Sequence, residues 1–225
     1  MNIIKAHAEI MNKVDPECID QMYQMMEQAG RTCYKSEDRI TPESARKFVA
    51  GLVKRGHEAM IEHASMTVKF VVDRGVSHEI VRHRIASFAQ ESTRYCNYSH
   101  EKFGNELTFI EPCFWKDSEH EPEMKAWKEM MSAAEELYLD FLSEGATPQE
   151  ARSVLPNSLK TELIVTMNMR EWRHFFKLRA AGVTGAPHPQ MLEVAVPLLQ
   201  RCQMLMPELF GDIVIPEDYK EKYSK

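Results

Sequence analysis

A basic cluster in the first half of the chain carries residue types that bind phosphate groups. Arg82, His83 and Arg84 are followed after seven residues by Ser92, and Arg94 stands two positions further on. An arginine presents a planar fork of donors that matches phosphate or carboxylate, and it keeps its charge. Apolar residues are interleaved with the cluster, so it must be partly buried, and buried arginines need partners. We therefore interpret the segment as a pocket for a nucleotide phosphate, and the alternative is a solvated charged face.

A second group of polar residues, later in the chain, has helical spacing. Arg170 and His174 are four positions apart and would share one face of a helix, with Arg173 beside them. Taken alone, this pattern also fits an amphipathic helix whose basic side is solvated.

A third polar segment, from His57 to His63, has two histidines and two glutamates. A helical zinc motif needs two histidines four positions apart, whereas these are six apart and would point about 240° away from each other. The spacing argues against zinc. The simplest interpretation from the residues alone is satisfied polar side chains near a helix-to-strand junction.

Composition and charge exclude several classes of function. The net charge of −6 over 225 residues argues against a general nucleic-acid binder, which needs a basic field over much of its surface. No apolar run is long enough to span a membrane, and no export signal is evident. The five cysteines lack metal-knuckle spacing, so reduced thiols and no bound metal are expected. We expect a cytoplasmic protein that binds neither nucleic acid nor membrane.

Apolar periodicity and turn residues predict the elements that position these groups. Strands are expected at 2–10, 65–72 and 107–111, and helices at 15–30, 41–56, 122–144, 147–155, 170–181 and 190–206. Ser77 is expected to cap a helix that runs into Arg82. The segment 159–166 fits either a strand or the buried start of a helix.

These elements predict an α+β fold, a mixed single domain spanning residues 1–225 with a central antiparallel-type sheet and surrounding helices. No strand–helix–strand repeat and no Gly-x-Gly-x-x-Gly fingerprint occur in the sequence. A Rossmann domain is therefore not expected.

The Arg-His-Arg cluster resembles the signature of the flavin-dependent thymidylate synthases, in which Arg-His-Arg is followed by seven residues, Ser, one residue and Arg. Every fixed position of that pattern is met. The segments 57–63, 150–156 and 168–179 are similar to further elements of the family, in order and at compatible spacings. The resemblance covers roughly residues 40–210.

The resemblance implies two sets of ligand-binding residues. The FAD cofactor would be contacted by Ala59 (through its backbone), Glu62, Arg82, His83, Arg84, Gln90, Asn168, Arg170 and His174. The nucleotide dUMP would be contacted by Glu79, Arg82, Gln90, Glu91, Ser92, Thr93, Arg94, Arg152 and Arg179. In the family, the arginine that corresponds to Arg152 reaches the nucleotide across a subunit interface, and the one that corresponds to Arg179 faces the pyrimidine base.

The implied reaction is the reductive methylation of dUMP to dTMP. Methylenetetrahydrofolate would donate the carbon, reduced FAD the hydride and NADPH the electrons, in a homotetramer with shared active sites. Arg179 would be the catalytic residue, stabilising a developing enolate by its fixed charge rather than acting as a base. No histidine or aspartate is visibly placed to activate Ser92, so we favour a phosphate ligand over a nucleophile there.

Two other functions stay open. A nucleotide- or flavin-binding paralogue without synthase activity is compatible with Ala59, where many family members carry Thr or Ser, and with the Pro/Gly-rich turn at 182–190. An RNA-binding module could use the arginines and Tyr95 as a stacking platform. The acidic net charge argues against this second alternative.

Overall fold

The computed structural model describes residues 1–101 and 104–224. Its strands are β1 (Asn2–Ile4), β2 (His7–Ile10), β3 (Ser65–Asp73), β4 (Ala86–Gln90), β5 (Thr108–Ile110) and β6 (Lys160–Asn168). Its longer helices are α1 (Pro16–Thr32), α2 (Ser44–Lys54), α3 (Arg74–Ile80), α4 (Glu121–Ser143), α6 (Met169–Arg179), α7 (Pro189–Leu205) and α9 (Glu217–Tyr223). Shorter helical turns are η1 (Glu37–Arg39), η2 (Glu58–His63), η4 (Ser118–His120), α5 (Pro148–Ala151), η5 (Arg152–Val154) and α8 (Pro207–Phe210).

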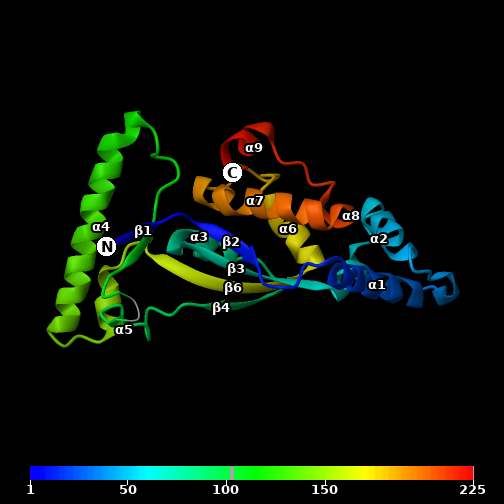
Figure 1. Cartoon of the computed structure of the whole chain (residues 1–225), viewed down its shortest axis with the longest axis horizontal. Helices are drawn as coiled ribbons and strands as arrows, with labels where there is room; N and C mark the ends of the chain where they lie inside the picture. The colour runs from blue at the N-terminus through cyan, green and yellow to red at the C-terminus, as the bar shows by residue number, and fades with distance from the viewer. Residues whose placement is uncertain (102–103, 225) are drawn as a thin grey trace. The chain divides into compact units, whose positions relative to one another are not determined.

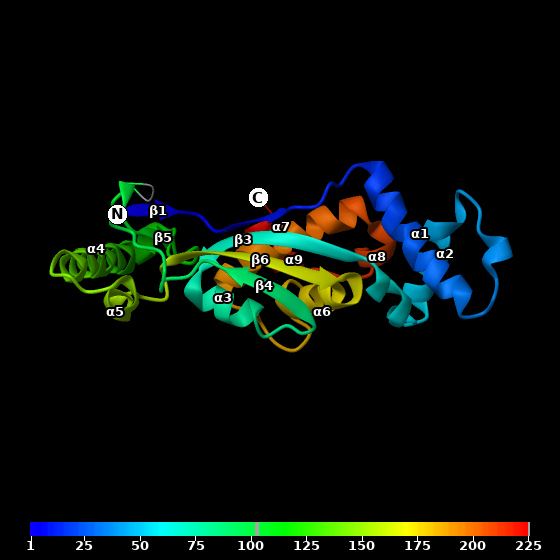
Figure 2. The same ribbon diagram turned by 90° about the horizontal axis from the view of Figure 1, so that it is seen from below.

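A four-stranded sheet has the strand order β2-β3-β6-β4 (Figures 1 and 2). The Met169 N–H donates to the Ala64 carbonyl at 2.9 Å, and the Thr67 and Thr166 hydroxyls lie 2.9 Å apart. Because partner numbers fall along one strand as they rise along the other, β3 and β6 run antiparallel. The predicted α+β fold with an antiparallel sheet is confirmed. The ambiguous segment at 159–166 lies in β6, where buried side chains alternate with half-buried ones.

The chain divides into two compact units. Unit 1 comprises Met1–His7, Phe70–Arg82 and Ala89–Leu163, and unit 2 comprises Ala8–Lys69, His83–Phe88 and Ile164–Lys225. The prediction of one domain over residues 1–225 stays a prediction. No helix among the described residues is long and apolar enough to cross a membrane.

Unit 1 has its own apolar core around α4. This core consists of Tyr98, Leu107, Phe109, Met131, Tyr138, Ala151 and Leu159. The strand pair β1–β5, which is parallel, belongs to the same unit. A capping box starts α5, since the Thr147 N–H donates to the Glu150 carboxylate at 2.8 Å.

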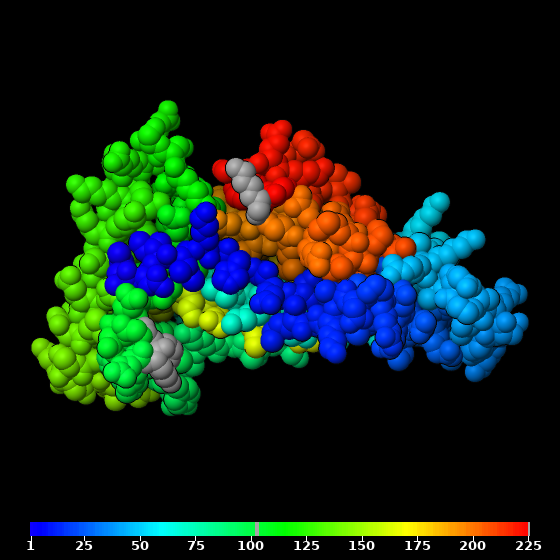
Figure 3. Space-filling model, in the orientation of Figure 1, coloured from blue at the N-terminus to red at the C-terminus, as the bar shows by residue number. Residues whose placement is uncertain are grey.

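Unit 2 has an aromatic core that anchors α6. Trp172 stacks on Phe176 with ring centroids 5.8 Å apart, and Phe176 meets Phe210 at 5.5 Å. The indole N–H of Trp172 also donates to the Met66 carbonyl at 2.9 Å, which ties α6 to β3. Helix α7 contacts α9 in this unit, and the two lie side by side in orange and red in Figures 1 and 3. Helix α6 is therefore a rigid platform for the polar side chains on its other face.

Several element boundaries differ from those predicted. Gly30 does not end α1, which continues to Thr32; instead, a Cβ on Gly30 would lie 2.6 Å from the Phe48 ring, so the glycine permits close packing of α1 on α2. The predicted strand at 2–10 is two strands, β1 and β2, in different sheets.

The predicted cap at Ser77 is wrong. The carboxylate of Asp73 accepts the Val76 N–H at 2.8 Å and begins α3 four residues earlier than expected. Helix α3 also ends earlier than expected, at Ile80, before the Arg-His-Arg segment. That segment forms the connection between α3 and β4 rather than a helical turn.

Candidate functional site

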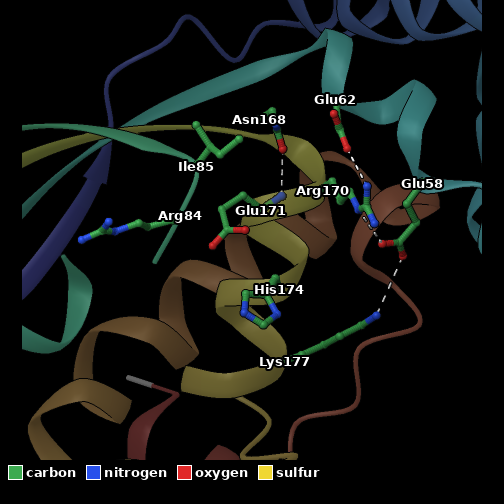
Figure 4. A pocket seen from close by; sticks show the side chains of 9 residues that line it. All are labelled: Glu58, Glu62, Arg84, Ile85, Asn168, Arg170, Glu171, His174 and Lys177. Carbon is green, nitrogen blue, oxygen red and sulfur yellow. Dashed lines mark hydrogen bonds and ion pairs between the residues drawn. The ribbon is translucent and has the colours of Figure 1, made fainter. Parts of the chain in front are cut away.

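Unit 2 contains a cavity of about 470 Å³ beside the first turns of α6 (Figure 4). Its lining residues are Glu58, Glu62, Arg84, Ile85, Asn168, Arg170, Glu171, His174 and Lys177. They come from η2, from the segment before β4 and from the end of β6 with α6. Those that were predicted to contact flavin are Glu62, Arg84, Asn168, Arg170 and His174. The cavity therefore brings together residues from three separate sequence motifs.

Asn168 ends β6 and caps α6. Its side-chain oxygen accepts the backbone N–H of Glu171 at 2.9 Å, an interaction that typically stabilises a helix start by about 1 kcal/mol. Fixing the first turn of α6 places Arg170 and His174 on the face that lines the cavity (Figure 4). Because the cap uses the oxygen, the side-chain NH₂ of Asn168 is the group that can donate to a ligand.

Arg170 is held over the cavity by the carboxylates of η2. Its guanidinium lies 2.6 Å from Glu62 and 3.9 Å from Glu58, and its side chain is 53% exposed. Exposed ion pairs of this kind contribute about 0–1 kcal/mol, so a ligand phosphate or carbonyl can replace Glu62 at little cost.

Arg173, which the sequence placed beside Arg170, faces a different environment. Its buried guanidinium makes a two-pronged ion pair with Asp212 at 2.6 and 2.7 Å and contacts Glu58 at 3.1 Å. It also donates to the Leu209 carbonyl. Arg173 thus fixes Glu58, which in turn lies 3.9 Å from Lys177 on the cavity wall.

His83 does not line the cavity, but it contacts the lining residue Glu171 and is almost fully buried. The Arg179 Nε donates to its Nε2 at 3.1 Å, and its Nδ1 lies 3.3 Å from Glu171 Oε1. Since an arginine nitrogen can only donate, Nε2 must be the acceptor and the ring proton must sit on Nδ1. Burial, helped by the nearby Arg179 and His174 charges, lowers the pKa of His83 to about 4, so this imidazole is neutral at pH 7.

Glu171 completes a hydrogen-bonded chain from carboxyl through imidazole to guanidinium. Burial raises the pKa of Glu171 to about 7, although the Arg84 backbone N–H and the Arg170 charge act in the opposite direction. This carboxyl therefore changes protonation near neutral pH. The imidazole of His83 also packs edge-on against Phe175, with ring centroids 5.0 Å apart.

His83, Glu171 and His174 also have the types and proximity of metal ligands. Their ligating atoms all lie within 4.8 Å of one another. Both ring nitrogens of His83 already take part in hydrogen bonds, so a metal ion would have to displace Glu171 or Arg179. A cation would also sit next to the Arg179 charge, which opposes its binding.

Unit 1 gathers the residues that were predicted to hold the nucleotide phosphate. Arg152 Nη1 donates to Thr93 Oγ1 at 3.4 Å, and the Arg94 backbone N–H donates to Ser92 Oγ at 3.3 Å. Arg94 Nε donates to Gln149 Oε1 at 3.1 Å. Arg94 and Arg152 are exposed, so both guanidinium groups are accessible to an anion.

Gln90 and Glu91, at the end of β4, have mainly internal partners in unit 1. Gln90 Nε2 donates to the Ser77 hydroxyl at 3.0 Å. The Glu91 carboxylate accepts from the Tyr98 hydroxyl at 2.9 Å and from Lys160 Nζ at 3.0 Å. Any ligand contact at Glu91 would have to share these hydrogen bonds.

The predicted nucleotide set is divided between the units. Glu79 and Arg82 lie in unit 1 at the end of α3, where the Arg82 N–H donates to the Glu79 carbonyl at 3.2 Å. Arg179 belongs to unit 2, where it donates a hydrogen bond to His83, one of the predicted flavin ligands. The roles of these residues stay predictions.

Ala59 lines a second and larger cavity of unit 2, of about 990 Å³, which shares Glu58 and Arg170 with the first. Cationic side chains on its wall include Arg31, Lys35, Arg39 and Arg55.

Four residues of the cavity lining were not among the predicted site residues: Glu58, Ile85, Glu171 and Lys177. The helical spacing that selected His174 would also have selected Glu171 and Lys177, each three positions away from it. Glu58 lies in the segment 57–63 that resembles a family element, but no role was assigned to it; its place at the cavity depends on the packing of η2 against α6.

Comparisons with known proteins agree on one family. The model for "thymidylate synthase complementing protein" matches residues 17–208. A flavin-dependent thymidylate synthase of Corynebacterium glutamicum is 31% identical over 210 residues, which cover 85% of this chain and 79% of that protein. The protein of the same name from Geobacter sulfurreducens is 31% identical over 82% of this chain and 78% of its own length. The one from Pyrococcus furiosus is 38% identical over 67% of this chain, but the match spans only 60% of that relative.

A similar fold occurs in a solved structure, that of the UMP/dUMP methylase PolB from Streptomyces cacaoi bound with 5-Br dUMP. The TM-score is 0.77, and the match covers 96% of this chain and 100% of the other at 22% sequence identity. At this identity the likeness establishes the fold.

Proposed function

Because the chain belongs to the thymidylate synthase complementing protein family, we propose that it is a flavin-dependent enzyme that methylates dUMP to dTMP. Methylenetetrahydrofolate is the proposed carbon donor and NADPH the proposed reductant. The observation that carries the proposal is the cavity of unit 2, which is lined by the predicted flavin ligands Glu62, Arg84, Asn168, Arg170 and His174 (Figure 4).

The donor set of this cavity fits a flavin. Arg84, Arg170 and Lys177 supply positive charge, and the Asn168 amide supplies hydrogen-bond donors. Ring carbonyls and phosphates of a flavin nucleotide accept such donors. When bound, the reduced flavin would carry the one-carbon unit and supply the hydride.

Arg179 is the proposed catalytic residue. Methylation at C5 of the uracil ring requires negative charge to develop at N3 and O4, and a fixed guanidinium can stabilise it. A preorganised donor of this kind typically contributes about 3–4 kcal/mol to the transition state. The hydrogen bond from Arg179 Nε to neutral His83 fixes the orientation of this guanidinium.

Arg94, Arg152 and Ser92 are proposed to bind the nucleotide phosphate in unit 1. Bidentate arginine–phosphate contacts are strong and directional, and the two exposed guanidinium groups are available for them. Ser92 Oγ accepts a hydrogen bond from the Arg94 backbone N–H, which suits a ligand role better than that of a nucleophile. A homotetramer with Arg152 shared between subunits, and a cytoplasmic location, remain part of the proposal.

The test is dTMP formation from dUMP, with FAD, NADPH and methylenetetrahydrofolate supplied and each omitted in turn. The proposal predicts product only when all of them are present. A folded protein that binds flavin but forms no dTMP would instead be the non-catalytic paralogue.

A further inference from the structure

We infer that Glu171 is a positioning residue, which holds His83 in the tautomer that accepts a hydrogen bond from Arg179 and so orients the Arg179 guanidinium. This inference rests on the proposed function, because the action of Arg179 on the pyrimidine is itself proposed. It adds a residue that none of the sequence motifs singled out.

The hydrogen-bond chain allows one arrangement of protons. Arg179 Nε can only donate, so His83 Nε2 must offer its lone pair, at 3.1 Å. The ring proton is then on Nδ1, and it points at Glu171 Oε1, 3.3 Å away. Glu171 is therefore the acceptor that stabilises this tautomer over the one with the proton on Nε2. With the proton on Nε2, His83 and Arg179 would present two donors to each other.

The surroundings of Glu171 hold its carboxyl in place. The Asn168 cap fixes its backbone at 2.9 Å, and the Arg84 backbone N–H donates to its side chain. Its side chain is only 12% exposed. The charged or titratable groups near it include His83 from the segment before β4 and Arg170 and His174 from α6 itself, and Arg84 and Lys177 line the same cavity. Glu62 and Glu58 of η2 act on it through Arg170.

The charge of Glu171 sets the strength of the chain. When the carboxyl is ionised, a negative charge and the Arg179 cation lie at the two ends of one polarised imidazole, and hydrogen bonds to ionised groups are about twice as strong as neutral ones. When it is protonated, the link to His83 weakens. Because the pKa of Glu171 is about 7, the orientation of Arg179 should tighten as the pH rises through neutrality.

The experiment compares wild type with Glu171→Gln and Glu171→Ala, and uses Glu217→Gln as the control. Glu217 is an exposed carboxylate of α9 that forms an ion pair with Lys220 at 3.0 Å. The first readout is the ¹⁵N NMR signal of His83 in histidine-labelled protein with a chelator present. It reports which ring nitrogen carries the proton and does not depend on turnover. The second readout is kcat and KM for dUMP between pH 6 and 8.

For Glu171→Gln, an amide oxygen can still accept from His83, so the tautomer should be kept. Its kcat should match wild type near pH 6 and fall about tenfold below wild type near pH 8, because the charged hydrogen bond is lost. For Glu171→Ala, the single Nδ1–H tautomer should be lost. Its kcat should fall about tenfold or more at both pH values, with less change in KM than in kcat. Glu217→Gln should behave like wild type.

Two results would overturn the inference while the proposed function stands. One is an identical His83 spectrum in wild type and Glu171→Ala. The other is a wild-type kcat and pH profile in both Glu171 variants. A wild-type protein that shows the Nδ1–H tautomer but forms no dTMP would instead refute the proposed function and, with it, the purpose assigned to Glu171.

Discussion

Arg170 and Arg179 are both cations of α6, but their partners give them different expected roles. Arg170 lines the cavity and pairs with the carboxylates of η2 through an exposed guanidinium. Arg179 is not among the lining residues of that cavity and donates to His83. Substitution of the first should therefore affect cofactor binding, and substitution of the second should affect the chemical step.

Arg179→Ala should lower kcat about 10²–10³-fold, the usual effect of removing one preorganised donor to a developing negative charge. The flavin content of the purified protein should stay close to that of wild type. Turnover and the flavin absorbance per protein, measured on the same preparation, test this. Wild-type turnover in the variant would remove Arg179 from the mechanism.

Arg170→Ala should release flavin without unfolding the protein, because its exposed pairs with Glu62 and Glu58 contribute about 0–1 kcal/mol. Equilibrium dialysis of flavin and the Tm of the apoprotein measure the two effects. Arg173→Ala serves as the comparison: it removes a buried guanidinium that pairs with half-exposed Asp212 and donates to the Leu209 carbonyl, so it should destabilise the protein more than Arg170→Ala does. Unchanged flavin affinity in Arg170→Ala would contradict the assignment of this cavity.

At the scale of elements, helix α1 packs closely on α2 because Gly30 lacks a side chain. A Cβ at this position would lie 2.6 Å from the Phe48 ring. The guanidinium of Arg31 also lies over this ring, 4.5 Å from its centroid. Gly30 and Phe48 both line the larger cavity of unit 2, so the packing of α1 on α2 shapes part of its wall.

Gly30→Ala should destabilise the protein by about 1–3 kcal/mol, the typical cost of overpacking. Gly51→Ala, in the middle of α2, is the matched control. The Cβ there would meet only the flexible end of Arg55 at 3.1 Å, so the substitution should be neutral or stabilise by about 0.5–1 kcal/mol. Chemical denaturation of both variants measures these changes, and equal effects would contradict the packing argument.

At the scale of the whole molecule, two groups of the site contribute opposite pH dependences to the free energy of unfolding. The pKa of Glu171 rises from an ordinary value of 4.5 to about 7, so between these values the folded state binds more protons and its stability falls as the pH rises. The pKa of His83 falls from 6.5 to about 4, so the unfolded state binds more protons there and stability rises with pH.

Glu171→Gln should remove the fall of the unfolding free energy with pH that the titration of Glu171 causes, and should leave the contribution of His83 in place. The difference in unfolding free energy, variant minus wild type, should therefore increase from about pH 4.5 to about pH 7 and be level on either side. Denaturant titrations across this range measure it. Parallel curves for the two proteins would show that Glu171 has an ordinary pKa.

The sequence predicted those elements whose signals are local. The strand expected at 65–72 and the long helix expected at 122–144 agree closely with β3 and α4. The boundaries that failed depend on tertiary contacts. Gly30 looked like a helix stop because the nearby Phe48 ring is eighteen positions away in the sequence.

The candidate site was predictable to a similar extent. The motifs selected Arg84, Asn168, Arg170 and His174, which the fold places around one cavity. Asp73 was missed as a cap because it directly follows the strand expected at 65–72, whereas Ser77 was taken as the cap of the next helix. Glu171 was missed because its significance depends on His83, which is 88 positions away.

The most direct test of the account is tritium release from dUMP labelled at C5, because binding alone cannot labilise that hydrogen. With FAD, NADPH and methylenetetrahydrofolate present, the wild-type protein should release tritium as dTMP forms, and omission of any one of them should stop the release. Arg179→Ala should release tritium about 10²–10³-fold more slowly while it retains flavin. A folded, flavin-loaded wild-type protein that releases no tritium would contradict the proposed reaction.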